Sequence, residues 1–255
     1  MQKGGFPLLK WTTNDKELQN KIDENELYLG CEKILKTETK VLGVKWDTES
    51  DELVFSFHSM LLLIGEDDLI TKRFILKIIS SVFDPLGVLS PFVMTLKLFF
   101  QELCSRKCSW DEELDEAFKL RWKKTLDTLK NFENIRISRY YLKGVETDVA
   151  TIELHGFADA SRKAYACVIY LRIVTKGDDV CTRFVASKTR VAPLAEKRIP
   201  RLELLSCLIL SRLVKVVMES LTNLHVGKIC CWTDSMDCAF WINRTDKLRK
   251  KFVQN

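Results

Sequence analysis

Three acidic residues in the second half of the chain have the type and spacing of a metal site. Asp159 ends the alternating apolar stretch TIELHGFAD, and Asp234 ends the short apolar run KICCWTD. Glu203 lies in the first turn of the amphipathic stretch IPRLELLSCLILSRLVKVVMESL. Two acids at strand ends and one on a helix can meet at one point. Hard carboxylate oxygens suit Mg²⁺ or Mn²⁺, so we expect these three side chains to hold divalent metal.

Such a site would hydrolyse phosphodiesters. Two divalent ions roughly 4 Å apart can activate a water molecule and stabilise the leaving oxygen. Asp159 would then contact both ions, and Glu203 and Asp234 one ion each. Each acid also has a structural explanation. Asp159 could cap a turn, Glu203 could be an acid favoured by the helix dipole, and Asp234 could be a helix N-cap.

The net charge of +5 is unevenly distributed along the chain. Residues 1–70 carry a net charge of −6 and residues 71–143 a net charge of +5, whereas residues 151–255 carry 18 Lys and Arg against 10 Asp and Glu. Basic side chains around carboxylates are typical of proteins that act on a polyanion, although a solvated basic surface would look the same. As a group, the expected phosphate contacts are Arg162, Lys163, Lys188, Arg190, Lys197, Arg198 and Arg201.

The elements that carry the acids predict an α/β fold. Three β-like runs, TIELHGFAD, KAYACVIYLRIV and TRFVASKTR, precede a helix that opens at Pro200, a fourth strand KICCWTD and a short helix SMDCAFWIN. The order β-β-β-α-β-α is that of an RNase H-like mixed sheet, with three antiparallel strands, a crossover helix and a parallel fourth strand. Trp232 and Trp241 are expected to be core residues rather than base-stacking surfaces, and His155 to be structural.

The first part of the chain predicts a small β-hairpin and then helices. VLGVKWDTESDELVFSF alternates on both sides of an acidic turn, as a hairpin does. TKRFILKIISSVF has apolar residues at helical spacing, and a turn follows at Asp84-Pro85-Leu86-Gly87. Ser90-Pro91 is typical of an N-cap and first-turn proline. DEELDEAFKLRWKKTLDTLKNF begins with acids and ends with bases, as the helix dipole favours.

Six segments together closely resemble the Pol polyprotein of BEL/Pao-type LTR retrotransposons, in the region also called the Pao retrotransposon peptidase family. They are LKWTTND, KVLGVKWD, SSVFDPLGVLSP, FADASRKAYACVIYLR, SKTRVAPLAEKRIPRLELL and WTDSMDCAFWI. The resemblance implies the end of a reverse transcriptase palm over residues 1–65, a helical thumb- or connection-like region over 66–148 and an RNase H-like domain over 149–255. It also implies an RNA–DNA hybrid or other nucleic acid as partner, Mg²⁺ or Mn²⁺ as cofactor, and the rest of a Pol polyprotein as the normal context.

The sequence departs from that family in two ways. The polymerase signature Tyr-x-Asp-Asp is absent, and Asp67-Asp68 has no preceding aromatic residue and is expected to form a surface turn. No residue matches the last acid of the family's RNase H domain. We therefore expect a domain truncated at its C-terminus, with slow or absent cleavage of the RNA strand. A catalytically inactive nucleic-acid-binding module is the alternative.

An aspartic peptidase explains the residues less well than a nuclease. That chemistry uses two Asp-Thr/Ser-Gly loops whose carboxylates share a proton. The sequence contains no such tripeptide, because Asp234-Ser235 is followed by Met236.

Cysteine usage and hydropathy predict the compartment. The 9 cysteines have no paired spacing, which favours reduced thiols. The start of the chain is polar within three residues, unlike a signal peptide. No apolar run approaches the roughly 20 residues that a membrane span needs. We expect an intracellular protein, cytoplasmic or nuclear, with no membrane partner.

Overall fold

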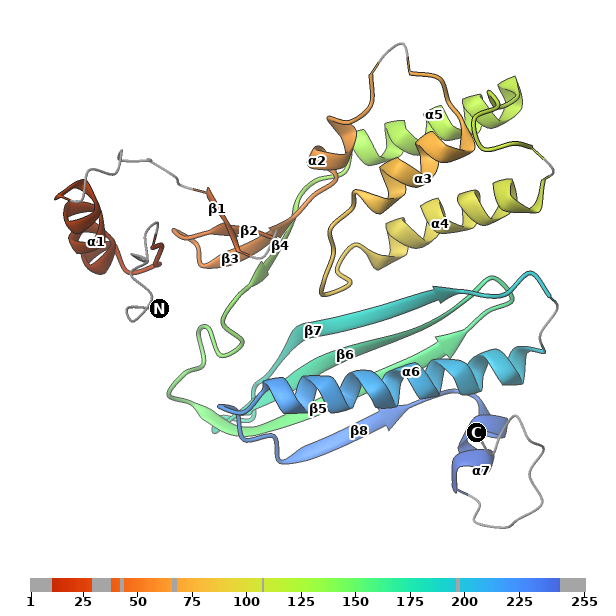
Figure 1. Cartoon of the computed structure of the whole chain (residues 1–255). Helices are drawn as coiled ribbons and strands as arrows, with labels where there is room; N and C mark the ends of the chain where they lie inside the picture. The colour runs from red at the N-terminus through yellow and green to blue at the C-terminus, as the bar shows by residue number, and fades with distance from the viewer. Residues whose placement is uncertain are drawn as a thin grey trace, which may run out of the picture. The chain divides into compact units, whose positions relative to one another are not determined.

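The computed structural model describes residues 11–28, 38–41, 44–65, 68–106, 108–195 and 198–243. The chain forms two compact units (Figure 1). One comprises Met1–Phe55 with Asn134–Lys143, and the other Ser56–Glu133 with Gly144–Asn255. Most of the helical stretch therefore belongs to the same unit as the strand-rich stretch that carries the three acids. The assignment of 1–65, 66–148 and 149–255 to parts of a polyprotein stays a prediction.

The first unit contains helix α1 (Lys16–Tyr28) and a four-stranded antiparallel sheet. The sheet order is β1 (Glu38–Val41), β2 (Val44–Asp47), β3 (Glu52–Phe55) and β4 (Ile135–Ser138). The predicted hairpin is confirmed as β2 and β3, which pair antiparallel on either side of the acidic turn. Asp51 in that turn accepts hydrogen bonds from Trp46 Nε1 (3.0 Å) and from Arg139 Nε (2.6 Å), so it joins the hairpin to the segment around β4.

Four helices open the second unit. They are α2 (His58–Leu61), α3 (Lys72–Ser80), α4 (Ser90–Ser105) and α5 (Glu116–Lys130). The helical spacing of TKRFILKIISSVF is confirmed, since α3 buries Ile75, Ile78 and Ile79. In the connection between α2 and α3, Asp67 lies outside the described residues, and Asp68 accepts a hydrogen bond from the backbone N–H of Gly65 (2.7 Å).

The prediction that Ser90 caps α4 is wrong. The N-cap position is occupied by Leu89, whose side chain cannot accept a hydrogen bond. The carboxylate of Asp84 accepts hydrogen bonds from the backbone N–H groups of Val88 and Leu89, both at 2.8 Å, and these two residues lie just before the helix. Asp84 therefore fixes the turn that leads into α4, and the N–H groups of Phe92 and Val93 in the first turn of the helix donate to the carbonyl of Leu89.

A second sheet follows, with the element order that the sequence predicts. It contains β5 (Val149–Ala160), β6 (Ala164–Thr175), β7 (Val180–Val191) and β8 (Lys228–Trp232), with α6 (Ile199–Ser220) before β8 and α7 (Met236–Asn243) after it. The strand order is β7-β6-β5-β8, and only the β5–β8 pair is parallel. The unit thus has a mixed sheet with helices, consistent with an RNase H-like region.

Helix α6 lies across one face of this sheet (Figure 1). Even-numbered residues of β5 such as Ile152 and Leu154 are buried beneath it. Gly156 allows α6 to approach the strand closely, since a Cβ atom there would lie 2.6 Å from Cδ1 of Leu210 on α6. The odd-numbered residues of β5 consequently point to the opposite face.

The turn before α4 is docked against β7. The backbone N–H of Ser187 donates to the carbonyl of Leu86 (2.8 Å), and Ser187 Oγ donates to the carbonyl of Gly87 (2.8 Å). Gly87 has a φ of +79°, and a Cβ atom there would lie 2.4 Å from the carbonyl oxygen of Ser187. Farther along α4, Gln101 Nε2 donates to the carbonyl of Ala192 (2.6 Å). These contacts make the helices and the second sheet one folded unit.

Two further expectations concern thiols and membranes. The 8 cysteines within the described ranges are free thiols. Among the helices that the structure describes, none combines the length and the apolar character that crossing a membrane requires.

Candidate metal centre

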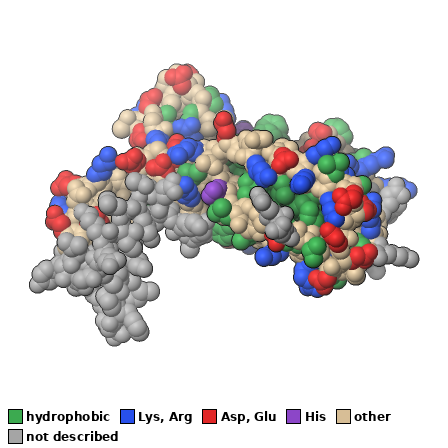
Figure 2. Space-filling model, turned by 90° about the horizontal axis from the view of Figure 1, so that it is seen from above, with side chains coloured by type: hydrophobic (Ala, Val, Ile, Leu, Met, Phe, Trp, Pro, Cys, Tyr) green, Lys and Arg blue, Asp and Glu red, His purple; other side chains and the backbone are tan. Residues whose placement is uncertain are grey.

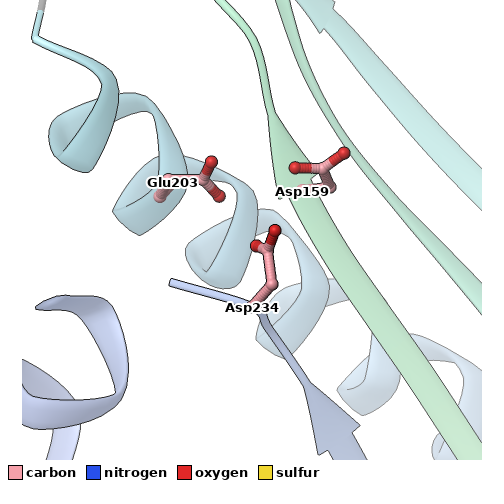
Figure 3. Close-up of side chains that lie close together, drawn as sticks. All are labelled: Asp159, Glu203 and Asp234. Atoms are coloured by element: carbon pink, nitrogen blue, oxygen red, sulfur yellow. The ribbon is translucent and has the colours of Figure 1, made fainter. Parts of the chain in front are cut away.

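The carboxylates of Asp159, Glu203 and Asp234 lie together at one end of the second sheet (Figure 3). One oxygen from each lies within 4.8 Å of the other two. Asp159 is near the end of β5, and Asp234 follows β8. Because β5 and β8 are parallel neighbours, the ends that carry these acids meet at the same edge of the sheet. Helix α6 brings Glu203 to that edge (Figure 3).

The three acids do not have the structural roles that the sequence left open, which were a turn cap, a first-turn helix acid and a helix N-cap. The turn after β5 is held by Ser161, whose Oγ accepts from the N–H groups of Lys163 and Ala164, both at 3.2 Å. Ser235 Oγ accepts from the N–H of Cys238 (3.3 Å) at the start of α7, so Asp234 is not the acceptor there. Glu203 lies beyond the first turn of α6, contrary to the sequence prediction, because the helix begins at Ile199.

Glu203 sits in an electrostatically unfavourable position. Its residue surface is only 7% exposed, and its Oε2 atom has no hydrogen-bond partner within the described part of the chain. Burial raises the pKa of this carboxyl, and the charges of Asp159 and Asp234 raise it further, while a hydrogen bond from the Ala160 N–H opposes them. A buried, unpaired carboxylate oxygen beside two other acids is costly unless a cation or a proton compensates it.

This arrangement fits a divalent cation. Three carboxylates converge and an orphaned carboxylate oxygen lies among them, and hard oxygen donors are what Mg²⁺ and Mn²⁺ prefer. The backbone N–H of Ala160 donates to Asp159 Oδ1 at 2.7 Å, which orients that carboxylate. The same N–H group lowers the pKa of Glu203, against the larger effect of burial.

The predicted phosphate contacts fall into three groups along the chain. Arg162 and Lys163 lie in the β5–β6 turn, Lys188 and Arg190 near the end of β7, and Arg198 and Arg201 at the start of α6, and all six are exposed. Lys197 lies outside the described residues. Asp159 on β5 pairs with Ala166 on β6, and Ala166 pairs with Thr189 on β7. Lys188 and Arg190 are the two neighbours of Thr189 in the sequence. Lys188 and Arg190 are therefore level with the acids along the sheet, two strands away, but their side chains point to the face opposite to that of Thr189 and Asp159, because neighbouring residues of a strand alternate between faces.

Several basic residues of the helical stretch form ion pairs with acids. On the face seen in Figure 2, basic and acidic side chains lie interspersed. The ion pairs join Arg73 to Asp111, Arg106 to Asp115, Lys119 to Glu113 and Arg121 to Glu102. Part of the positive charge of that stretch is thus neutralised by acids, in ion pairs within α3, α4, α5 and the segments that connect them.

The prediction that Trp232 belongs to the core is wrong. This residue is 51% exposed, and Trp241 is only half-buried. Phe157, which pairs with Trp232 across β5 and β8, is 44% exposed. The sequence held a signal for this surface: Glu153, His155, Phe157 and Asp159 alternate with the buried apolar residues of β5, and so share the face away from α6.

The fold and the acids together define an RNase H-like protein. Three features assign the protein to this class: the strand order β7-β6-β5-β8, the crossover helix α6 and the three converging carboxylates. A family model described as "Pao retrotransposon-like RNaseH-like domain" matches residues 71–235. The chain belongs to this family, as the resemblance of its segments implied. The comparison with curated proteins returned no significant match.

The matched range falls mostly within the second unit and also includes Asn134–Lys143 of the first. It begins at α3, includes the turn docked on β7, and ends one residue after Asp234. Membership of an RNase H-like family implies nucleic acid as the partner.

Proposed function

We propose that the second unit carries an RNase H-type nuclease site, which hydrolyses the RNA strand of RNA–DNA hybrids with divalent metal held by Asp159, Glu203 and Asp234. The observation that carries the proposal is the buried Oε2 atom of Glu203, which lacks a hydrogen-bond partner among the described residues and lies beside two further carboxylates. If no cation were bound, this arrangement would destabilise the folded protein, and nothing would compensate the cost.

The protein's own groups prepare the site. Mg²⁺ or Mn²⁺, when bound, would lower the pKa of water and neutralise charge at the leaving oxygen. The Ala160 N–H holds the Asp159 carboxylate in place, and burial limits the rotamers of Glu203. Ser235 caps α7, which leaves both oxygens of Asp234 available.

The exposed basic residues would bind the substrate backbone. Arg162 and Lys163 in the β5–β6 turn lie just past Asp159 in the chain, and Arg198 and Arg201 lie just before and within the start of α6. Cations that bind phosphates release counterions, so affinity for a hybrid should fall steeply as salt rises. Affinity that is flat between low and moderate salt would instead indicate an ordinary solvated surface.

Metal-dependent melting tests the proposal directly. Thermal unfolding is followed with and without Mn²⁺ for the wild type, for Asp159→Asn and for Asp237→Asn. A ligand at 100 times its Kd stabilises the folded state by about 2.7 kcal/mol, so Mn²⁺ should raise the wild-type Tm. Asp159→Asn should lose most of this rise. Asp237, an exposed acid in the first turn of α7 and outside the cluster, provides the matched control and should behave like the wild type.

Hybrid cleavage on the same three proteins separates catalysis from binding. Cleavage of the RNA strand that Asp159→Asn abolishes would support a nuclease. Stabilisation by Mn²⁺ and hybrid binding without cleavage would support the inactive binding module. A wild-type melt that Mn²⁺ leaves unchanged, with no cleavage, would remove the metal site from consideration.

A further inference from the structure

Three aromatic rings stand on the exposed face of the second sheet, and we call His155, Phe157 and Trp232 the aromatic platform. The rings of His155 and Trp232 lie within 10° of parallel with centroids 6.0 Å apart. Those of Phe157 and Trp232 lie within 14° of parallel with centroids 6.4 Å apart. Phe157 and Trp232 are 44% and 51% exposed while the His155 side chain is only 17% exposed, so the alignment indicates two exposed rings held in one orientation by a more buried third.

A chain of hydrogen bonds holds this orientation. Trp232 Nε1–H donates to His155 Nδ1 (3.0 Å), and His155 Nε2 lies 3.0 Å from Glu153 Oε2. Arg172 Nη1 donates to the same oxygen of Glu153 (3.0 Å). Because Nδ1 accepts from the indole, the hydrogen of a neutral imidazole is on Nε2 and points to Glu153. The exposed indole is therefore tied through histidine to an ion pair.

The platform continues the line of the acids. Phe157 is two residues before Asp159 on β5, and Trp232 is two residues before Asp234, so each ring lies roughly 7 Å along the chain from an acid. At the other end of the platform, Lys228 and Arg172 are both in register with Glu153. Along these strands the order is thus acids, rings and then basic side chains.

The outer side of Trp232 is open to a ligand. β8 is the last strand of the sheet on that side within the described ranges, and both ring partners of Trp232 belong to β5. Every nucleobase has a π-face, so stacking on an aromatic side chain accepts any base, and nearby Lys or Arg can follow the phosphates.

We propose that the aromatic platform binds an unpaired base of a nucleic-acid strand that extends beyond the acid site, with Lys228 and Arg172 near its phosphates. The inference rests on the proposed function, because it takes the three acids as the place where the duplex is held. A single-stranded extension is favoured over an apolar protein segment, since Glu153, Arg172 and Lys228 place two cations and one anion at the end of the platform.

The test compares two hybrids, one blunt and one with a single-stranded extension, by fluorescence anisotropy with the wild type, Trp232→Leu, Trp232→Phe and Trp110→Leu. The wild type should bind the extended hybrid more tightly than the blunt one, by roughly 5- to 150-fold for one stacked base. Trp232→Leu should remove this preference, while Trp232→Phe, which keeps a π-face, should retain part of it. Trp110 is 46% exposed and lies between α4 and α5, so Trp110→Leu controls for loss of an exposed indole and should keep the preference.

Each outcome decides one hypothesis. Equal preference in Trp232→Leu and the wild type would overturn the platform. Self-association that Trp232→Leu abolishes, with no effect on the extended hybrid, would also overturn it and assign the rings to a second copy of the chain. The Mn²⁺-dependent rise in Tm of Trp232→Leu reports separately on the carboxylates. A preference for the extended hybrid, without any effect of Mn²⁺ on the Tm and without cleavage, would leave the platform standing and refute the nuclease.

Discussion

Replacing Gly87 with alanine should destabilise the second unit far more than the same change at Gly144. Both glycines have a positive φ, +79° and +84°, in which an L-residue costs roughly 1–2 kcal/mol. At Gly87 the new Cβ atom would also lie 2.4 Å from the backbone oxygen of Ser187, whereas at Gly144 it would meet no atom within 4 Å. Overpacking of this kind costs about 1–3 kcal/mol more. The expected loss is therefore about 2–5 kcal/mol at Gly87 and about 1–2 kcal/mol at Gly144.

Urea unfolding of the wild type and the two variants measures this difference. Both substitutions reduce the entropy of the unfolded chain equally, so that contribution cancels between them. Hydrogen exchange of the Ser187 amide, which donates to Leu86, should accelerate in Gly87→Ala alone. Equal destabilisation by the two substitutions, with unchanged protection of Ser187, would refute the claim that this turn anchors the helices to β7.

Further predictions concern the acid site, the packing of α6 and a helix cap. In metal-free protein the raised pKa of Glu203 means that the folded state binds more protons than the unfolded state just above the ordinary value of 4.5. Wild-type stability relative to Glu203→Gln should therefore fall as pH rises through that window, and urea titrations that show the opposite slope would contradict this. Gly156→Ala should cost about 1–3 kcal/mol by forcing Leu210 aside, and a double-mutant cycle with Leu210→Ala should be less than additive. Asp115→Ala should cost about 0.5–2 kcal/mol in thermal unfolding because the carboxylate accepts from the Phe118 N–H (2.9 Å), and an unchanged Tm would exclude this cap.

Periodicity sufficed for the elements that have long, regular patterns. β5 and β6 alternate in burial over most of their 12 residues, β7 does so on both sides of an irregularity at Val185-Ala186, and α6 repeats at helical spacing over 22 residues. The hairpin of β2 and β3 was predictable because apolar residues alternate on both sides of its acidic turn. In contrast, β4 has only 4 residues and pairs with β3, more than 75 residues earlier, so nothing local indicates it.

The acids were predictable by type, but their surroundings depend on tertiary structure. Strand ends and a helix suggested that Asp159, Glu203 and Asp234 could meet, and the structure brings them together. The N-cap of α4 was assigned one residue too late, at Ser90, because the turn before the helix is held by the Asp84 carboxylate on the N–H groups of Val88 and Leu89 and no side chain caps the helix. The core assignment of Trp232 failed for a related reason: a short strand at a sheet edge can be apolar in sequence and still face solvent.

The parallel pairing of β5 with β8 decides when the acid cluster can exist during synthesis. Asp159 and Glu203 leave the ribosome before Asp234. The last acid joins them only when β8 pairs with β5, which closes a loop of about 70 residues that includes α6. Strand pairs separated this far along the chain form late in folding, because the entropy cost of closing the loop comes before the contacts that offset it. A nascent or misfolded chain would thus hold two acids apart from the third, and the complete acid cluster would exist only in folded molecules that include β8.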